Sequence, residues 1–395
     1  MKRRFFLTTT ALVCVLGVSA QGNYEETLGQ SGANVINTAV PFLRIAPDSR
    51  SGAMGDAGIA LSPDAYAQIW NSSKLAFVEN PYGLSITYVP WLRQLINDMN
   101  LAYVSGYYQL DKLQAVGASL RYFTMGNVTF YDNNGQQFGN YSPHELALDL
   151  SYNRKLSDNF ALGLAGRFIY SNLTGGQGGQ DNEQVEAGKS FAVDINGYYT
   201  DKIQLSEYDC DWAVGFNISN LGAKLGYTAE TKNFIPTNLG IGGSFTMNVD
   251  KYNKVTATVD FNKLLVPTPP EYYEDSTDAN GYKVIRAGKS EDVGIIQGMF
   301  QSFGDAPGGF KEEMNEVTAS VGLEYWYADQ FAARLGYFHE NENKGNRKYF
   351  TAGIGLKMKV LGLDFSYLIP AGNFSNSPLK NTWRFSLIVS FEDLN

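Results

Sequence analysis

The sequence contains little cysteine and little histidine, which limits both covalent cross-linking and metal binding. Its 395 residues include two cysteines and two histidines. Residues 1–20 are typical of an export signal: basic residues, then an apolar stretch, then a small-residue cleavage site. Cleavage removes Cys14 and leaves Cys210, so an internal disulfide is excluded. One cysteine and two widely separated histidines also predict no metal site.

Beyond this signal, no stretch reaches the roughly 20 apolar residues that a membrane-spanning helix requires. The formal net charge is −9, and removal of the three basic residues of the signal changes it to −12 (−9 − 3). An acidic chain disfavours nucleic acid as a partner. The glycine-rich stretch 175–179 is not followed by a helix with Lys and Ser or Thr, so we expect neither a phosphate-binding loop nor a cofactor.

Short segments in which every second residue is apolar or aromatic recur along most of the chain. This alternation is typical of strands with one apolar and one polar face. Fourteen segments, mostly of 9–13 residues, match tilted crossings of a bilayer. With 25 Tyr, 24 Phe and 41 Gly, they predict an all-β fold: a 14-stranded antiparallel transmembrane β-barrel in the bacterial outer membrane, over residues 81–391. The segments are 82–89, 100–108, 113–125, 143–154, 159–171, 190–200, 211–220, 237–249, 254–263, 316–327, 330–339, 349–359, 361–369 and 382–391.

The connections between these segments differ in length according to their order. Outer-membrane barrels have short periplasmic turns and long extracellular loops, whereas a soluble sandwich has no reason to separate them in this way. The chain follows the barrel pattern. Short connections follow even-numbered strands, at 109–112, 155–158, 250–253, 328–329 and 360, with a somewhat longer one at 201–210. Long connections follow odd-numbered strands, at 126–142, 172–189, 221–236, 264–315 and 340–348.

Charged residues lie on the strand faces opposite the apolar ones. An Arg or Lys that faces lipid at the midplane costs about 2–4 kcal/mol, so we expect these residues to face the lumen. Their mixed signs predict a network of ion pairs across the interior. The residues are Arg121, Asp149, Arg167, Asp194, Asp260, Glu324, Arg334, Lys357 and Arg384.

Residues 21–80 precede the predicted wall and contain three closely spaced glycines, Gly52, Gly55 and Gly58, among small residues. Such spacing suits close packing, so we expect this stretch to fold into the lumen as a plug. A loose periplasmic tail is the alternative, although a tail would be more uniformly polar.

Apolar residues in two outer loops are the candidate binding residues. The first outer loop carries Trp91, Leu92, Leu95 and Ile96. The loop 264–315 is too long for a bare connection, and its stretch 291–303 predicts an amphipathic helix that covers the mouth or binds a partner. Together the two groups predict a docking patch; alternatively they pack on each other and cap the barrel. The helix residues are Val293, Ile296, Phe300 and Phe303.

Three residues are candidates for catalysis: Ser142, His144 and Glu145. Barrel acyl hydrolases need Ser and His on adjacent lipid-facing positions, oriented by an acid. Because these three residues lie where a loop enters a strand, an ordinary surface histidine is the better interpretation. We therefore predict no enzyme activity, and no lipopolysaccharide deacylation in particular.

The stretch AVPFLRIAPDSR (39–50) and the following GAMGDAGIA (52–60) together resemble the N-terminal region of the PorV family. These proteins are outer-membrane barrels of the Bacteroidetes type IX secretion system. Residues 54–71 resemble, more broadly, the hatch of FadL-type fatty-acid transporters, although Ser72-Ser73 replaces the Pro-Ala of that hatch. The resemblance implies that the plug motif comprises Arg50, Gly52, Gly55, Asp56, Gly58, Asp64 and Asn71.

The resemblance implies a non-enzymatic role in protein secretion. PorV-family proteins receive cargo that carries a C-terminal signal domain from the translocon pore. They bring it to an attachment complex with the PorU sortase, PorQ and PorZ, where cargo is joined to lipopolysaccharide in the outer membrane. The alternative is FadL-type transport of hydrophobic small molecules, which predicts a continuous apolar pocket between plug and wall.

Overall fold

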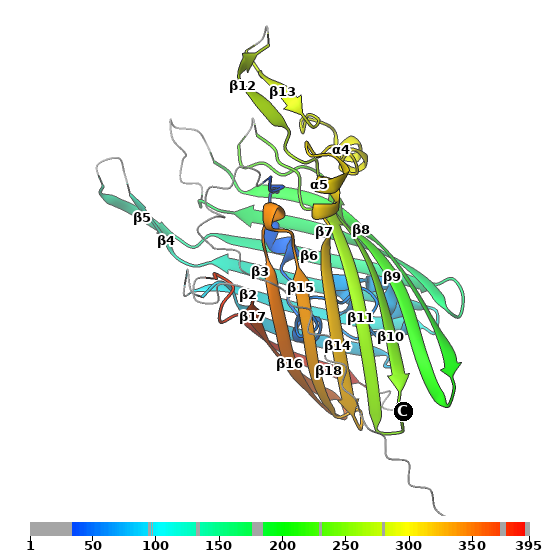
Figure 1. Cartoon of the computed structure of the whole chain (residues 1–395). Helices are drawn as coiled ribbons and strands as arrows, with labels where there is room; N and C mark the ends of the chain where they lie inside the picture. Colours follow the sequence, from blue (N-terminus) through cyan, green and yellow to red (C-terminus); the bar gives the residue numbers. More distant parts are fainter. Residues whose placement is uncertain are drawn as a thin grey trace, which may run out of the picture.

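Fourteen strands form a closed antiparallel barrel in the computed structural model of the chain (Figure 1). The structure describes residues 34–93, 96, 98–131, 135–175, 185–228, 231–278, 281–371 and 377–391. The expected export signal, residues 21–33 and Leu95 lie outside the described residues. The barrel confirms the predicted fold class. Around the barrel, the hydrogen-bonded strands follow the order β1-β18-β17-β16-β15-β14-β11-β10-β9-β8-β7-β6-β3-β2, and β2 pairs with β1 to close the ring.

The first and last strands close the barrel, with Tyr82 opposite Phe391 and their ring centroids 5.0 Å apart. Observed strand ends lie close to the predicted ones. The bounds are β1 Tyr82–Pro90, β2 Met99–Asp111, β3 Gln114–Met125, β6 His144–Lys155, β7 Phe160–Asn172, β8 Gly188–Leu205, β9 Tyr208–Gly222, β10 Asn238–Asn248, β11 Asn253–Leu264, β14 Thr318–Tyr327, β15 Phe331–His339, β16 Lys348–Met358, β17 Leu361–Pro370 and β18 Trp383–Phe391.

One predicted connection is wrong in length. The stretch 201–210 is not a longer loop, because β8 and β9 continue to a tight turn at Ser206 and Glu207. Residues 202–207 are all exposed. The outward face of β8 carries Asp201 but is apolar again at Ile203 and Leu205, so a single polar residue on this face does not mark the end of the strand.

The described residues of two long connections form additional strands and helices outside the barrel wall. The connection from β3 to β6 forms a hairpin of β4 (Val128–Tyr131) and β5 (Gln137–Tyr141). The outer loop, residues 265–317, contains a second hairpin and two short helices that stand above the upper rim of the barrel in Figure 1. Its elements are β12 (Glu271–Thr277), β13 (Lys283–Ala287), α4 (Ile295–Gln301) and α5 (Phe310–Asn315).

None of the helices within the described ranges has the length and apolarity needed to span a membrane.

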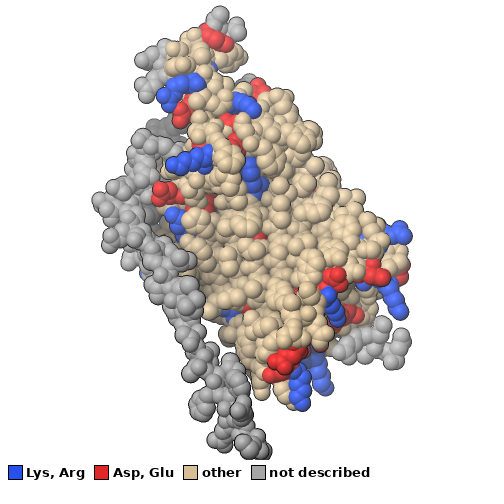
Figure 2. Space-filling model, turned by 45° about the vertical axis from the view of Figure 1, so that its right-hand side comes forward, with Lys and Arg blue, Asp and Glu red and all other residues tan. Residues whose placement is uncertain are grey.

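Side chains along the strands alternate between an apolar outer face and a polar inner face. On β6, Leu148 and Leu150 are exposed, whereas Ala147 and Asp149 between them are buried. Figure 2 shows a broad band with few charged side chains between charged ends of the molecule. This band fits the hydrocarbon layer of a bilayer, and the strand polarity agrees with the predicted outward and inward faces.

The inner segment, residues 39–78, lies inside the barrel (blue in Figure 1). Its Val40, Phe42 and Leu43 pack in one cluster with Leu101 and Ile169, on the inner faces of β2 and β7. A second cluster joins its distal part to the wall. Contacts with well-separated strands require the segment to lie within the ring. Its helical turns are η1 (Pro41–Arg44), α2 (Ser49–Gly52), α3 (Ala67–Trp70) and η2 (Ser72–Phe77).

Candidate functional site

A chain of buried ion pairs joins the inner segment to the wall. Nη1 of Arg50 lies 2.6 Å from Asp64 and its Nη2 lies 2.9 Å from Glu324 on β14. Glu324 in turn pairs with Arg334 on β15 at 2.7 Å, and Arg334 with Asp364 on β17 at 2.5 Å. Each charge is taken out of water next to opposite charges, so the loss of one member leaves its partners unpaired.

Asp56 and two neighbouring glycines form a second attachment. The Asp56 carboxylate accepts hydrogen bonds from Arg384 of β18 at 2.7 Å and from the Tyr349 hydroxyl of β16 at 2.6 Å. Gly55 has φ +71°, and a Cβ there would lie 2.4 Å from the carbonyl oxygen of Tyr337. A Cβ at Gly52 would overlap the Arg384 guanidinium. The glycines therefore allow the segment to approach the wall closely.

Gly58 and Asn71 attach the segment to two further strands, β11 next to β14 and β8 further around the ring. The Asp260 carboxylate of β11 accepts hydrogen bonds from the backbone N–H groups of Gly58 and Ile59, at 2.7 and 2.9 Å. The Asn71 amide donates to the carbonyl of Gly197 on β8 at 2.9 Å. The structure thus brings all seven predicted motif residues together at contacts within the segment or between it and the wall.

Most of the predicted lumenal charges are buried inside the barrel. Arg167 on β7 pairs with Asp149 at 2.5 Å and with Asp194 at 2.9 Å, and Arg121 donates to the carbonyl of Leu43 at 2.7 Å. Lys357 differs, because it lies near the end of β16 and is exposed. The charges therefore form separate clusters around the inner segment and not one network across an open lumen.

The two predicted halves of the docking patch lie on opposite sides of the outer mouth, the barrel end that bears the long connections. Four strands separate the β1–β2 pair from the β11–β14 pair on one side, and six on the other. Trp91 is half-buried and packs against the cluster around Phe42, Leu92 is half-buried, and Ile96 is exposed. Loops come together only when the strands that carry them are neighbours in the barrel. The Trp91 loop and α4 are carried by strands that are not neighbours, so the two lie apart.

The predicted helix over residues 291–303 is present but shorter. It begins after Gly294, so Ile296 and Phe300 lie in α4, whereas Val293 precedes it and Phe303 follows it. Ile296, Phe300 and Phe303 are exposed, with Phe300 at 69 %. An exposed aromatic side chain on a helix above the rim is an available contact for a protein partner.

Ion pairs fix the base of the outer loop to the barrel rim. Lys263 at the end of β11 pairs with Glu313 at 3.0 Å and Glu316 at 2.5 Å. Lys344 of the β15–β16 connection pairs with Glu312 at 2.6 Å and Glu316 at 2.9 Å. Glu312 is partly exposed, whereas the other four side chains of these ion pairs are largely buried. The ion pairs therefore hold α5 in one position against the rim.

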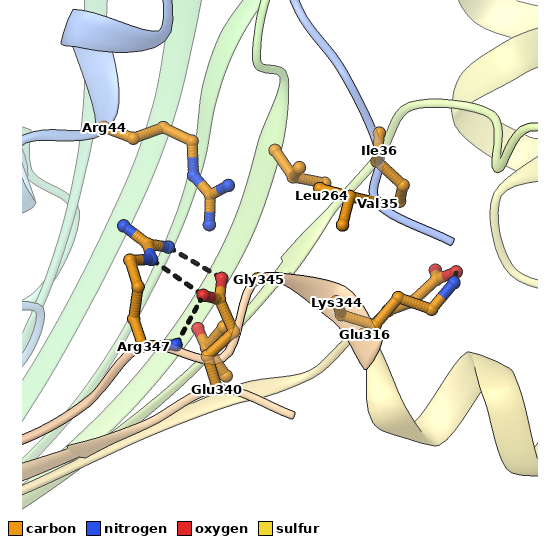
Figure 3. A pocket seen from close by; sticks show the side chains of 10 residues that line it. Val35, Ile36, Arg44, Leu264, Glu316, Glu340, Lys344, Gly345 and Arg347 are labelled. Carbon is orange, nitrogen blue, oxygen red and sulfur yellow. Dashed lines mark hydrogen bonds and ion pairs between the residues drawn. The ribbon is translucent and has the colours of Figure 1, made fainter. Parts of the chain in front are cut away.

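A charged cavity of about 220 Å³ lies at the outer mouth, between the inner segment, the rim and the base of the outer loop. Figure 3 shows Arg44 and Arg347 reaching toward each other across it from η1 and from the β15–β16 connection. Lys344 also lines the cavity, as do Glu316 and Glu340. Three cations and two anions leave the lining with one excess positive charge.

Arg44 is the unpaired charge of this mouth cavity. Glu340 holds Arg347 through contacts of 2.7 and 2.8 Å, which raise the pKa of Arg347 although burial opposes this. Within the described part of the chain, Arg44 makes no hydrogen bond or ion pair of its own. Burial and the nearby Arg347 guanidinium lower its pKa to about 10, so it stays protonated at neutral pH and attracts an anion.

Sequence reasoning missed this cavity, because its cations come from segments about 300 residues apart. One signal was available: Arg44 is the single charged residue in the otherwise apolar stretch AVPFLRIAP, 39–47. A charge in such a stretch needs a polar environment after folding.

The residues weighed for catalysis do not assemble into a catalytic site. The Ser142 hydroxyl bonds to the Asn127 side chain, and the His144 ring bonds to the backbone carbonyl of Ser142 at 3.1 Å. Glu145 faces the opposite side of β6, where it accepts from Ser171 at 2.7 Å. Across the residues that the structure covers, no group of three His, Cys, Asp or Glu side chains could hold a metal ion.

A closed fourteen-stranded barrel with an apolar outer face and charged interior defines an outer-membrane β-barrel protein. The chain matches the model of the family "Type IX secretion system protein PorV" over residues 28–271. This match covers more than half of the chain, which therefore belongs to the PorV family and is an outer-membrane component of type IX secretion.

Several solved structures are similar to the chain at low sequence identity. The toluene transporter TodX of Pseudomonas putida has 14 % identity, with 87 % of this chain and 98 % of that chain covered and a TM-score of 0.44. The toluene transporter TbuX of Ralstonia pickettii has 12 % identity, coverage of 86 % and 95 %, and a TM-score of 0.43. A FadL homologue of Pseudomonas aeruginosa has 11 % identity, coverage of 91 % and 99 %, and a TM-score of 0.41. No curated protein sequence matches the chain.

Proposed function

We propose that the chain is a non-enzymatic carrier that binds the C-terminal signal domain of secreted cargo at its outer mouth. In this proposal it receives cargo from the translocon pore and delivers it to the attachment complex that contains the PorU sortase, PorQ and PorZ. The cargo is there joined to lipopolysaccharide. The support comes from family membership and from the contrast between a buried inner segment and an exposed outer loop.

The inner segment makes the barrel a poor conduit for a polypeptide. It is joined to the inside of the wall through buried apolar clusters and ion pairs such as Arg50–Glu324. Opening the bore would separate these charges, at several kcal/mol for each unpaired ion. We therefore propose that residues 39–78 act as a plug and that cargo binds on the outside.

The observation that carries the proposal is the pair of exposed apolar residues on α4, Ile296 and Phe300, above a loop base fixed by Lys263 and Lys344. A rigid support lowers the entropy cost of binding, and a central aromatic anchor can supply much of the affinity. Phe303 contributes at the edge of this surface. Trp91 and its loop, on the opposite side of the mouth, contribute a separate contact.

We assign the mouth cavity to an acidic group of the cargo, because Arg44 offers a free guanidinium there. A carboxylate matches the two-pronged geometry of a guanidinium. The terminal carboxylate of a C-terminal signal domain is such a group.

Capture of cargo by tagged protein in outer-membrane extracts tests the proposal. We expect the Ile296→Ala/Phe300→Ala variant to bind at least tenfold less cargo than the wild type, because it loses a binding anchor. Phe191→Ala is the matched control: Phe191 is equally exposed, at 70 %, but lies on the outward face of β8. Equal capture by all three proteins contradicts the site, and fatty acids in place of secretion partners favour the transporter alternative.

The cavity has its own test in the same assay. Arg44→Gln removes the free cation and should weaken cargo capture several-fold, an effect that decreases as salt is added. Lys202→Gln is the control, because Lys202 is an exposed cation beside the tight turn between β8 and β9, at the barrel end opposite the mouth. If both variants bind cargo equally well, Arg44 has no part in recognition.

A further inference from the structure

A second cavity, of about 290 Å³, lies outside the barrel, between α5 and the outer surface of β10 and β11. We call it the wall groove. Its sides are formed mainly by Ile241 and Phe261 of the wall, Phe303 after α4, and Phe310 and Met314 of α5. The groove is therefore apolar on both its barrel side and its loop side.

The charged residues of the wall groove are already satisfied. Lys263 is engaged by Glu313 and Glu316 at 3.0 and 2.5 Å, and Glu313 also accepts from the backbone N–H of Asp305 at 2.7 Å. A water-soluble ligand would find few free polar partners here. A hydrocarbon chain has no hydrogen bonds with water to give up, so its burial in such a site has no desolvation cost.

The position of the groove on the barrel shows whether it opens to water or to lipid. Ile241 and Phe261 are register partners, each three residues from the outer end of its strand, or roughly 10 Å below the rim. They are 53 % and 50 % exposed on the outward face of the barrel. The groove is thus continuous with the lipid-facing wall at the level of the outer leaflet.

The loop side of the groove is strongly exposed. Phe310 is 80 % exposed and Met314 is 54 % exposed. Apolar area gains roughly 25 cal/mol per Å² when it is removed from water, so contact with a hydrocarbon chain favours this arrangement of α5.

We infer that the wall groove holds an acyl chain of an outer-leaflet lipid, clamped between α5 and the barrel. The continuity with the lipid-facing strands favours lipid over a protein occupant. Ile296 and Phe300, the main residues proposed for cargo, do not line the groove, and only Phe303 at the edge of the cargo surface belongs to both. The inference therefore stands independently of the proposed cargo site.

Native mass spectrometry of protein extracted from its membrane in mild detergent tests this inference. We expect the wild type to retain about one lipid per chain, and Ile241→Trp, which fills the groove, to retain at least fivefold less. Ile354→Trp is the matched control, because Ile354 is an exposed isoleucine on the outward face of β16, away from the groove. It should retain lipid as the wild type does.

A wild type without bound lipid, or equal retention by Ile241→Trp, overturns the inference. Heat-modified migration in gels verifies that each variant forms a barrel. If Ile241→Trp does not fold, Phe310→Ser/Met314→Ser tests the same groove from the loop side without a change in any strand. A lipid held in the lumen would survive both groove variants, and loss of cargo capture without loss of lipid would report on the cargo site alone.

Discussion

The inner segment and the outer loop are both non-strand parts of the same barrel, but they present opposite chemistry. The inner segment is buried, and besides its apolar clusters it meets the wall through charged groups such as Arg50 and Asp56 in ion pairs. The outer loop uses ion pairs at its base and turns apolar residues such as Phe300 and Phe310 outward. Paired charges hold a segment in place, whereas exposed apolar residues on a fixed support provide binding surface.

Breaking the buried ion-pair chain should have the largest effect on stability. Glu324→Gln leaves Arg50 and Arg334 facing each other without their shared carboxylate, and we expect a loss of about 3–5 kcal/mol in the free energy of unfolding. Urea unfolding of the protein in detergent or vesicles measures it, and limited proteolysis reports whether the inner segment has loosened. Arg50→Met/Glu324→Gln should lose less than the sum of the two single variants, since it removes both charges together.

Gly55 tests the close approach of the inner segment to the wall. Gly55→Ala combines the cost of a left-handed backbone, about 1–2 kcal/mol, with overlap against Tyr337, about 1–3 kcal/mol more. Gly135 is a matched control, because its φ is +77° and nothing lies within 4 Å of an added Cβ. Gly135→Ala should therefore show the backbone cost alone, and similar losses for both variants would contradict the close packing at Gly55.

Phe300 and Phe303 test whether the outer loop has two separate surfaces. Phe300→Ala should raise the Kd for cargo about tenfold, or about 1.4 kcal/mol, with little change in bound lipid. Phe303→Ala should lower lipid retention more than cargo binding, because Phe303 lines the wall groove. Binding titrations and native mass spectrometry on the same preparations separate the two effects. A single shared surface would make both variants behave alike.

The barrel could be predicted from sequence because its rules are local. Alternation within each strand and the parity of connection lengths give the strand number and both faces of the wall. The predicted strand end is wrong at β8, where Asp201 interrupts the apolar outward face although Ile203 and Leu205 continue it to the turn.

The site is harder to predict because closure of the ring, not order in the chain, decides which residues meet. The motif residues Arg50 and Asp56 could be named from sequence, but their partners Glu324 and Arg384 lie about 270–330 residues further on. The same closure separates Trp91 from Phe300 by at least four strands. Arg44 shows the other limit, since an isolated charge predicts a polar environment without showing which residues supply it.

The smallest expected effect on stability comes from breaking an ion pair that has good geometry but is exposed to water. Lys254 and Asp329 lie 2.9 Å apart, the same distance as Arg50 and Glu324, but their side chains are 37 % and 67 % exposed. In water the attraction is screened and the entropy of two long side chains opposes it, so Lys254→Met should change the free energy of unfolding by less than about 1 kcal/mol. The same urea titration that detects Glu324→Gln measures it. A loss comparable to that of Glu324→Gln would mean that burial is not what distinguishes the interior pairs, and that the attachment of the inner segment has another cause.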